Sequence, residues 1–359
     1  MSKLLRRLWP CVRAPLGLSS GLRVLAAGLV IAASLLPISG YAQSDELIAL
    51  AKKEGKVMIY GEIITPTLRG IKEGFEAKYP GITMEFVYLS GAPLMNRIVS
   101  EQDAKRYLAD VIVIDTPRMP LLQEKGYLTP YESVEQARYD KQWWSDPPNY
   151  WVRNHFYLGG IMYNTKSVAP ADVPKTYFDI LDPKWRGQIA IVSPVANELM
   201  FALYAGFVRD MGEEKAFKFF EGLAAQKPLV FGPGGIRVSQ GVGTGEFPIG
   251  IGFVGHVYGV GREPGYNMAI ALIDPIYAVG GPGFSVLKNA PHPNAARLAV
   301  DYMLSTPAQE RIAQSGYRSN DPAVQGRREI TEANISVAPV PTGAEAERLR
   351  SKLKQLFGS

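Results

Sequence analysis

Apolar and polar positions alternate along residues 44–130 in segments that predict strands and helices in turn. Apolar runs at 56–60, 82–88 and 111–114 are typical of strands. The run at 111–114 is apolar throughout, as expected of a strand buried on both faces of a parallel sheet. Each run leads to residues that favour a helix start, and these are Thr65-Pro66, Ser90-Gly91 and Asp115-Thr116-Pro117. This alternation predicts an α/β fold with right-handed crossovers.

A second group of strands and helices is predicted after residue 175. Apolar runs at 188–192 and 247–251 indicate strands, and helical patterns cover 197–210 and 216–224. The last helical pattern, 344–357, is charged and amphipathic, and we expect it to pack on a lobe without carrying chemistry.

Aromatic residues are concentrated between residues 125 and 160. Large side chains of this kind either pin a surface-hugging loop region or form an aromatic wall on a ligand cleft. The pattern leaves both interpretations open.

The first 42 residues have the pattern of a secretory signal peptide. Five basic residues and no acidic one are followed by an apolar run at 24–36 and by the small residues of Gly40-Tyr41-Ala42. The run is shorter than the roughly 20 residues that a membrane-spanning helix needs, so a retained anchor is the weaker alternative. We therefore expect a periplasmic protein with a cleaved signal.

Charge and cysteine content restrict the partners. The chain has 39 basic and 34 acidic residues, and with the five basic residues of the leader removed, 34 of each sign remain. A neutral mature chain argues against a nucleic-acid partner, which usually needs a basic face. The single cysteine, Cys11, precedes the apolar run of the leader, so we expect neither a lipid anchor nor a disulfide.

The predicted strands should bring three loops together at one edge of a sheet. In α/β sheets, ligands bind beyond the carboxyl ends of the strands, so the loops at 61–65, 88–91 and 115–118 should share that edge. The free N–H groups of the helix starts there can receive an anion. Alternatively, the same residues only cap their helices.

An ordered set of motifs resembles the periplasmic solute-binding proteins of ABC importers, in the branch that includes ferric-iron binders. The motifs span residues 47–320 and are Ala51-Lys-Lys-Glu-Gly-Lys-Val-Met-Ile-Tyr60, Phe75-Glu-Ala-Lys-Tyr-Pro-Gly81, Ala109-Asp-Val-Ile-Val-Ile-Asp115, Tyr163-Asn-Thr165, Phe178-Asp-Ile-Leu-Asp-Pro-Lys-Trp-Arg-Gly187, Gly245-Glu-Phe-Pro-Ile-Gly250 and the segment 281–309. The resemblance implies the two-lobed type II periplasmic-binding-protein fold, with two crossover segments and a ligand cleft between the lobes.

The resemblance also implies how the chain is divided and what it works with. The crossovers are expected near 160–163 and 274–277. Lobe 1 is expected to hold residues 43–162 and 276–359, and lobe 2 residues 163–275. The lobes would close on a small-molecule ligand by a hinge motion and dock, as a monomer, on permease transmembrane subunits that carry a cytoplasmic ATPase.

The ligand-binding residues expected from the loops and from the resemblance are Glu62, Ile64, Thr65, Ser90, Gly91, Thr116, Ser193, Val195, Asn197, Gly255 and His256. In iron-binding members an adjacent tyrosine pair follows the Gly-Glu-x-Pro strand, whereas Gly255 and His256 occupy those positions here. The three histidines, His155, His256 and His292, have no metal-like spacing. We therefore expect no metal site and no cofactor, with ferric iron or a ferric chelate as the alternative.

A small organic anion or zwitterion of the phosphonate, sugar phosphate or carboxylate type is the favoured ligand. The turn before Asn197 opens a helix where relatives present N–H groups to an anion, and His256 could donate a hydrogen bond or carry a charge. Arg118 and Arg153 are candidate charge partners, or else solvated surface residues. Glu62 could receive an ammonium group.

The sequence also bears on two other classes of function. Gly250-Ile-Gly252-Phe-Val-Gly255 matches a dinucleotide fingerprint, but the glycines and proline that follow it disfavour the helix that the motif needs. We therefore expect no enzyme. A binding protein that serves a sensor kinase or chemoreceptor would present the same lobes, so this alternative stays open.

Overall fold

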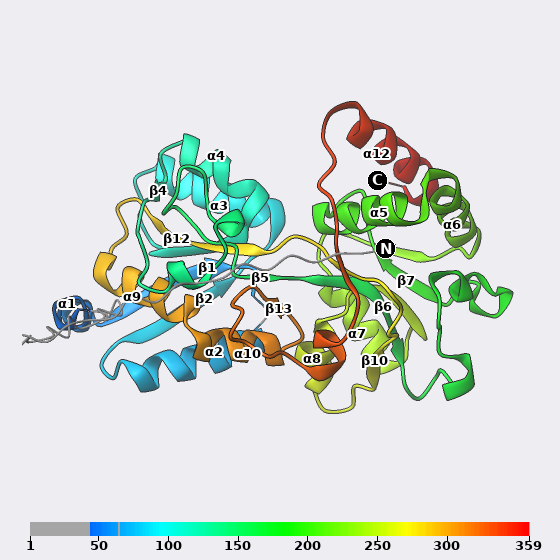
Figure 1. Ribbon diagram of the computed structural model, residues 1–359, viewed down its shortest axis with the longest axis horizontal. Coiled ribbons are helices and arrows are strands. Elements are labelled where there is room, and N and C mark those ends of the chain that lie inside the picture. Colours follow the sequence, from blue (N-terminus) through cyan, green and yellow to red (C-terminus); the bar gives the residue numbers. More distant parts are fainter. Residues whose placement is uncertain (1–43, 64, 359) are drawn as a thin grey trace, which may run out of the picture. The chain divides into compact units, whose positions relative to one another are not determined.

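The computed structural model describes residues 44–63 and 65–358, and Figure 1 shows its elements. The expected leader, 1–42, and Ile64 lie outside these residues. One sheet, here the first sheet, has the strand order β2-β1-β3-β12-β4. Its strands are β1 (Lys56–Gly61), β2 (Thr83–Tyr88), β3 (Val111–Asp115), β4 (Leu128–Thr129) and β12 (Pro282–Leu287). Strand β1 is parallel to β2 and β3, as expected, whereas β12 is antiparallel to β3 and β4.

Helices cover both faces of the first sheet. They are α1 (Asp45–Glu54), α2 (Thr65–Lys78), α3 (Gly91–Asp103), α4 (Met119–Glu124), α9 (Pro293–Leu304) and α10 (Thr306–Gln314). Successive side chains of a strand point to opposite faces, so Ile112 and Ile114 of β3 join the hydrophobic cluster of α3 and α4. Val111 and Val113 join the cluster of α2 and α9. The uninterrupted apolar run of β3 is thus explained by burial on both faces.

The second sheet has seven strands in the order β14-β11-β6-β9-β7-β8, with β10 paired to β6. Its strands are β6 (Leu158–Asn164), β7 (Ile189–Val192), β8 (Leu229–Phe231), β9 (Ile249–Phe253), β10 (Met268–Ile270), β11 (Ile276–Ala278) and β14 (Ile335–Val337). The helices that follow or flank them are α5 (Glu198–Met211), α6 (Glu213–Ala225), α7 (Ile236–Thr244), α8 (His256–Gly259), α11 (Arg328–Thr331) and α12 (Gly343–Phe357). In Figure 1, α5, α6 and α12 lie on one side of this sheet and α7 and α8 on the other.

Shorter elements complete the described chain. Strands β5 (His155–Phe156) and β13 (Arg318–Ser319) pair with each other in a sheet of two. The 3-10 helices are η1 (Thr116–Arg118), η2 (Gln136–Arg138), η3 (Lys141–Trp143), η4 (Pro170–Asp172), η5 (Tyr177–Leu181), η6 (Pro183–Trp185) and η7 (Val260–Arg262). The helix start expected at Thr116-Pro117 is therefore a 3-10 turn that leads into the short α4.

The chain passes between the two sheets through residues 156–158 and 279–281. The crossovers expected near 160–163 and 274–277 fall instead on β6 and β11, which pair antiparallel within the second sheet. The passages therefore lie just before β6 and just after β11. A third passage, 320–334, returns from α10 and β13 to β14, which pairs with β11.

The sheets also correct the expected division of the chain at three segments. Strand β6 begins before residue 163 and pairs with β9, while β11 and β14 belong to the second sheet and not to the first. Helix α12 packs against α6, because its buried stripe of Leu349, Leu353 and Phe357 faces that side of the molecule. The ring of Phe357 lies 5.8 Å from that of Tyr204 in α5. The rest of the division into lobes stays a prediction.

Candidate functional site

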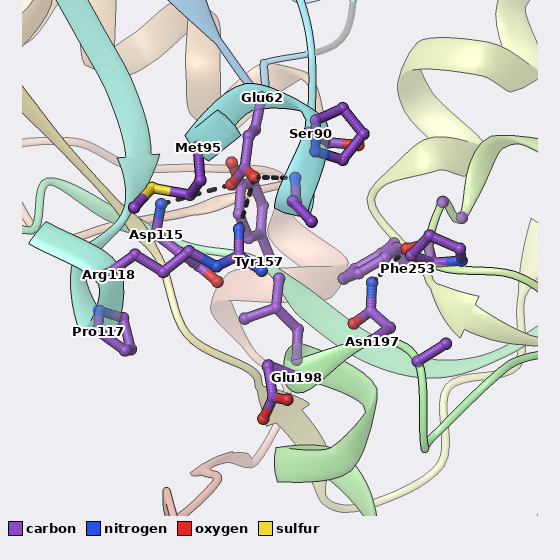
Figure 2. Close-up of a pocket in the computed structure, with 18 of the residues that line it drawn as sticks. Glu62, Ser90, Met95, Asp115, Pro117, Arg118, Tyr157, Asn197, Glu198 and Phe253 are labelled. Atoms are coloured by element: carbon purple, nitrogen blue, oxygen red, sulfur yellow. Dashed lines mark hydrogen bonds and ion pairs between the residues drawn. The ribbon is translucent and has the colours of Figure 1, made fainter. Parts of the chain in front are cut away.

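A cavity of about 580 Å³ lies between elements of the first sheet and elements of the second (Figure 2). The first-sheet side, here the carboxylate wall, is formed by Glu62, Tyr88, Ser90, Gly91, Ala92, Pro93, Met95, Asn96, Asp115, Pro117, Arg118 and Leu121. The second-sheet side, here the helix-start wall, is formed by Ala196, Asn197, Glu198, Leu199, Pro233, Gly234, Gly235, Phe253 and His256. Tyr157 and Tyr317 complete the lining. The loops after β1, β2 and β3 thus share one edge, as expected for an α/β sheet.

The carboxylate wall is held together by hydrogen bonds to Glu62, whose side chain is 9% exposed. The Gly91 N–H donates to Glu62 Oε1 at 2.8 Å, and Arg118 Nη1 donates to the same oxygen at 2.9 Å. The Asp115 N–H donates to Oε2 at 3.4 Å. Because Gly91 is the first residue of α3, an internal carboxylate already occupies this helix start.

Asp115 ends β3 and is 2% exposed. Burial, reinforced by the neighbouring Glu62 carboxylate, raises the pKa of Asp115 to about 8, while Arg118 and Arg153 act in the opposite direction. Its Oδ1 atom is buried and has no hydrogen-bond partner within the described residues. At neutral pH the carboxyl group is therefore mainly protonated.

The helix-start wall presents backbone N–H groups for which the described part of the chain provides no acceptor. The Asn197 side chain caps α5 by accepting from the Met200 N–H at 2.9 Å, and its Nδ2 donates to the Pro233 carbonyl at 2.5 Å. Within the described residues, no acceptor is found for the N–H groups of Glu198 and Leu199, or of Gly234 and Gly235. Two helix starts, those of α5 and α7, therefore lie side by side with unused donors.

His256 also lines the helix-start wall, at the first residue of α8. Burial lowers the pKa of His256 to about 4, so the ring is uncharged at neutral pH. The hydroxyl of Ser239 lies 2.8 Å from Nδ1 and donates to the Gly235 carbonyl at 3.1 Å. The position of His256 in the cavity agrees with the expectation, whereas a charged ring does not.

Five of the expected ligand-binding residues line the cavity: Glu62, Ser90, Gly91, Asn197 and His256. Four others, Thr116, Ser193, Val195 and Gly255, are not in the lining and make contacts within the protein. The Thr116 hydroxyl accepts from Arg153, and the Ser193 hydroxyl accepts from the N–H groups of Val195 and Ala196, which shapes the turn before α5. The Val195 carbonyl accepts from Arg350 at 3.4 Å.

Gly255, the fourth of these residues, lies at a close backbone contact. A Cβ atom at Gly255 would come within 2.9 Å of the Gly316 carbonyl oxygen, so the absence of a side chain permits the contact. Ile64 lies outside the described residues, and Thr65 is the first residue of α2.

The two candidate arginines have different positions. Arg118 lines the cavity, but Glu62 takes one of its donors. Arg153 donates from Nε and Nη2 to the Thr116 hydroxyl at 2.8 and 2.6 Å and stacks near the rings of Trp143 and Phe156. Arg153 is not part of the lining.

The aromatic residues between 125 and 160 have both of the roles that the sequence left open, since some pin the loop region and one lines the cavity. Tyr157 lines the cavity, whereas Trp151 is buried in the cluster of α3 and α4, and Trp143 packs edge-on against Phe156. Tyr157 and Tyr317 lie with their ring centroids 5.5 Å apart. Burial raises the pKa of both phenols, so both are neutral in the metal-free protein.

Some lining residues could have been found in the sequence. Asp115 closes an apolar strand at the predicted edge, and Gly232-Pro-Gly-Gly235 has the glycines of an exposed helix start. No sequence pattern around Tyr317 indicates that it lines a cavity. In the part of the chain that the structure describes, no group of three or more His, Cys, Asp and Glu side chains could hold a metal ion, and no helix is long and apolar enough to cross a membrane.

The two sheets, the passages between them and the cavity at the strand ends define a periplasmic-binding-protein fold of type II. Residues 107–334 match the family described as bacterial extracellular solute-binding protein, and the chain belongs to that family. This class provides the solute-binding components of ABC importers.

Curated relatives and solved structures cover most of the chain. An uncharacterised Haemophilus influenzae protein is 26% identical over 319 residues (84% of this chain, 83% of that one). Iron uptake protein A1 of Synechocystis is 26% identical over 305 residues (80% and 82%). The binding protein AfuA of Actinobacillus pleuropneumoniae, with fructose-6-phosphate bound, has a TM-score of 0.66 at 23% identity (84% and 98%). An Agrobacterium tumefaciens substrate-binding protein has a TM-score of 0.70 at 18% identity (84% and 94%).

Proposed function

We propose that this chain captures a small organic anion or zwitterion, of the phosphonate, sugar phosphate or carboxylate type, and delivers it to an ABC permease from the periplasm. The observation that carries the proposal is the pair of helix starts at α5 and α7 on one wall of the cavity, whose first N–H groups have no acceptor among the described residues. Each start stabilises an anion by about 0.3–1 kcal/mol, and by up to about 2 kcal/mol where it is partly buried. A phosphate or carboxylate group can accept from both at once.

The carboxylate wall limits where the anion can lie. Glu62 already takes the N–H of Gly91 and a donor of Arg118, and Pro93 has no N–H to offer. An anionic group brought to this side would meet Glu62 without gaining these donors. On the helix-start wall the Glu198 carboxylate is paired with Arg350, so this wall is the more favourable side for the anionic end of the ligand.

The first test is native mass spectrometry of the chain purified from the periplasm without refolding. A bound mass of a few hundred daltons would identify the ligand class. If the chain is free of ligand, a thermal-shift screen of sugar phosphates, phosphonates, carboxylates, polyamines and ferric chelates follows. Stabilisation only by polyamines or ferric chelates would contradict the proposal.

A variant tests the helix-start wall with the ligand so found. His256→Ala should weaken binding by about tenfold, or about 1.4 kcal/mol, because the ring forms part of the buried wall. His292→Ala is the matched control, since His292 pairs with Asp110 outside the cavity. Equal affinity of the His256 variant and the parent chain, measured by calorimetry, would remove His256 from the site.

Ferric iron or a ferric chelate is the second candidate. The phenols of Tyr88, Tyr157 and Tyr317 line the cavity, and hard oxygen donors suit ferric iron. The name of the Synechocystis relative favours the same ligand. Against it, Gly255 and His256 stand where iron-binding members have a tyrosine pair, and burial raises the pKa of all three phenols. A visible charge-transfer band on addition of ferric citrate would favour this candidate over the organic anion.

The proposal includes the partners and the hinge. Permease subunits with an ATPase would receive the monomeric protein with its lobes closed, and small-angle scattering should show compaction on ligand binding. A sensor kinase or chemoreceptor is the alternative receiver. Genes for a permease and an ATPase beside this one would favour transport.

A further inference from the structure

The Oδ1 atom of Asp115 is an acceptor on the carboxylate wall for which the described residues supply no donor, although the backbone of Gly281 interacts with the same carboxyl group. This oxygen is buried, and an unsatisfied buried polar atom is costly unless something else satisfies it. Glu62, by contrast, accepts from Gly91, Arg118 and the Asp115 N–H. A ligand that reaches this wall therefore finds a free acceptor on Asp115.

Asp115 and Leu199 pack closely around Gly280. A Cβ atom at Gly280 would lie 3.3 Å from Asp115 Oδ1 and 2.5 Å from Leu199 Cδ2, so the absence of a side chain there lets Leu199 approach the Asp115 carboxyl group. Leu199 belongs to the first turn of α5, which places Asp115 near the start of the helix-start wall. Figure 2 shows Asp115 and Glu62 on one side of the cavity and Asn197 on the other.

We propose that the Asp115 carboxyl group receives a hydrogen-bond donor of the bound solute, an ammonium or a hydroxyl group, while the anionic group of the same solute lies on the helix-start wall. This inference rests on the proposed function, because it assumes that an anion binds there. The solute class is then a short-chain anion whose far end carries a donor.

The charged and titratable groups around Asp115 distinguish the two donors. Glu62, Arg118 and Arg153 act on its charge, and the Tyr157 phenol is close enough to be affected by it. A neutral hydroxyl group can bind the protonated carboxyl. An ammonium group would favour the ionised carboxyl and so release a proton into solution near pH 7.

Binding of three phosphate esters, which differ only in the group at the end away from the phosphate, tests whether Asp115 receives a donor. Ethyl phosphate has no donor, 2-hydroxyethyl phosphate has a hydroxyl group, and 2-aminoethyl phosphate has an ammonium group. By calorimetry at pH 7, the parent chain should bind one of the two donor esters at least about tenfold more tightly than ethyl phosphate. Asp115→Ala should abolish this preference and leave the affinity for ethyl phosphate within about threefold.

A second substitution identifies the donor. Asp115→Asn keeps a carbonyl acceptor but cannot ionise, so it should retain a preference for the hydroxyl ester and lose one for the ammonium ester. For the ammonium ester, the binding heat of the parent chain should also vary with the ionisation enthalpy of the buffer. Asp110→Asn is the control for removal of a buried carboxylate, because Asp110 lies at the opposite end of β3 and accepts from Met58 and His292.

The outcomes separate the two levels of the proposal. If no phosphate ester binds the parent chain, the proposed anion site is wrong, and the proposed role of Asp115, which depends on that site, is wrong as well. If all three esters bind equally, or if Asp115→Ala keeps the preference for a donor ester, only the role of Asp115 is wrong.

Discussion

The two walls of the cavity contain the same kind of feature, the start of a helix, but use it differently. At α3, Glu62 accepts from the Gly91 N–H, so the donor is satisfied within the protein. At α5 and α7, the N–H groups of Glu198, Leu199, Gly234 and Gly235 have no acceptor among the described residues. A helix start therefore has N–H groups to offer to an anion only where no internal carboxylate has already accepted from them.

The largest expected effect comes from breaking the ion pair of the carboxylate wall. Arg118→Ala should lower the free energy of unfolding by about 3 kcal/mol, because it leaves the poorly exposed Glu62 without its cationic partner. Urea denaturation measures this. Lys218→Ala breaks the exposed pair with Glu214 and should leave the free energy of unfolding unchanged within error. An Arg118 variant as stable as the parent would show that the wall does not depend on this pair.

A smaller effect should appear in the pH dependence of stability. Asp115 has a folded-state pKa of about 8 and an unfolded one near 4, so the folded chain binds more protons between these values and stability falls as pH rises. Burial lowers the pKa of His155 to about 3 and of His256 to about 4, so stability instead falls as pH drops below about 6.5. Stability should therefore be greatest near pH 6.5.

The same measurement identifies Asp115 as the cause. Between pH 6.5 and 8 the free energy of unfolding should decrease by about 1 kcal/mol in the parent chain, because the loss from Asp115 exceeds the remaining gain from the two histidines, and Asp115→Asn should remove this decrease. Chemical denaturation at four pH values in this range is sufficient. A parent chain whose stability is constant or rises over this range would mean that Asp115 is ionised in the folded state.

The smallest effect concerns the helix-start wall. Asn197→Ala should cost about 1 kcal/mol of stability through loss of the cap on α5, and it should weaken phosphate-ester binding several-fold by loosening the link to Pro233. Asn197→Asp retains the acceptor for the Met200 N–H but loses the donor to Pro233. Because the added carboxylate also repels an anion at the start of α5, this variant should keep the stability of the parent but bind phosphate esters more weakly than the alanine variant does, and equal affinity of the two variants would mean that the anion does not lie there.

Much of the fold could be predicted from local patterns, and the reasons are visible in particular elements. Strand β3 is apolar throughout because both faces are covered, and α1 ends at Gly55, whose φ of +76° suits glycine. The pairing of β11 and β14 beside β6 was missed because it joins segments far apart in the sequence. The position of α12 was missed for the same reason: its amphipathic stripe indicates burial but not the partner.

The site could be predicted only in part. The predicted strand ends indicate the sheet edge at which the cavity lies, and the loops at that edge contain the lining residues Glu62, Ser90 and Gly91. Thr116 and Ser193 have the same residue types as ligand-binding residues, yet their hydroxyls serve Arg153 and the turn before α5. Sequence patterns do not show which hydroxyl group already forms hydrogen bonds within the protein. Asp115 could not be chosen from the sequence, because an aspartate at the end of a strand also predicts a helix cap, whereas its burial beside a second carboxylate is visible only in the structure.

Strand β14 affects how many backbone groups the edge of the second sheet offers for pairing with another molecule. It lies at the edge of the second sheet and covers β11, whose Ile276 N–H donates to the Asn334 carbonyl. A chain cut before Asn334 would leave the outer backbone groups of β11 open to a strand from another molecule. With β14 in place, the edge is only three residues long, and Arg209 donates to the Val337 carbonyl there. The third passage between the sheets thus ends in a short edge strand, and a short edge offers few backbone groups for pairing with another molecule.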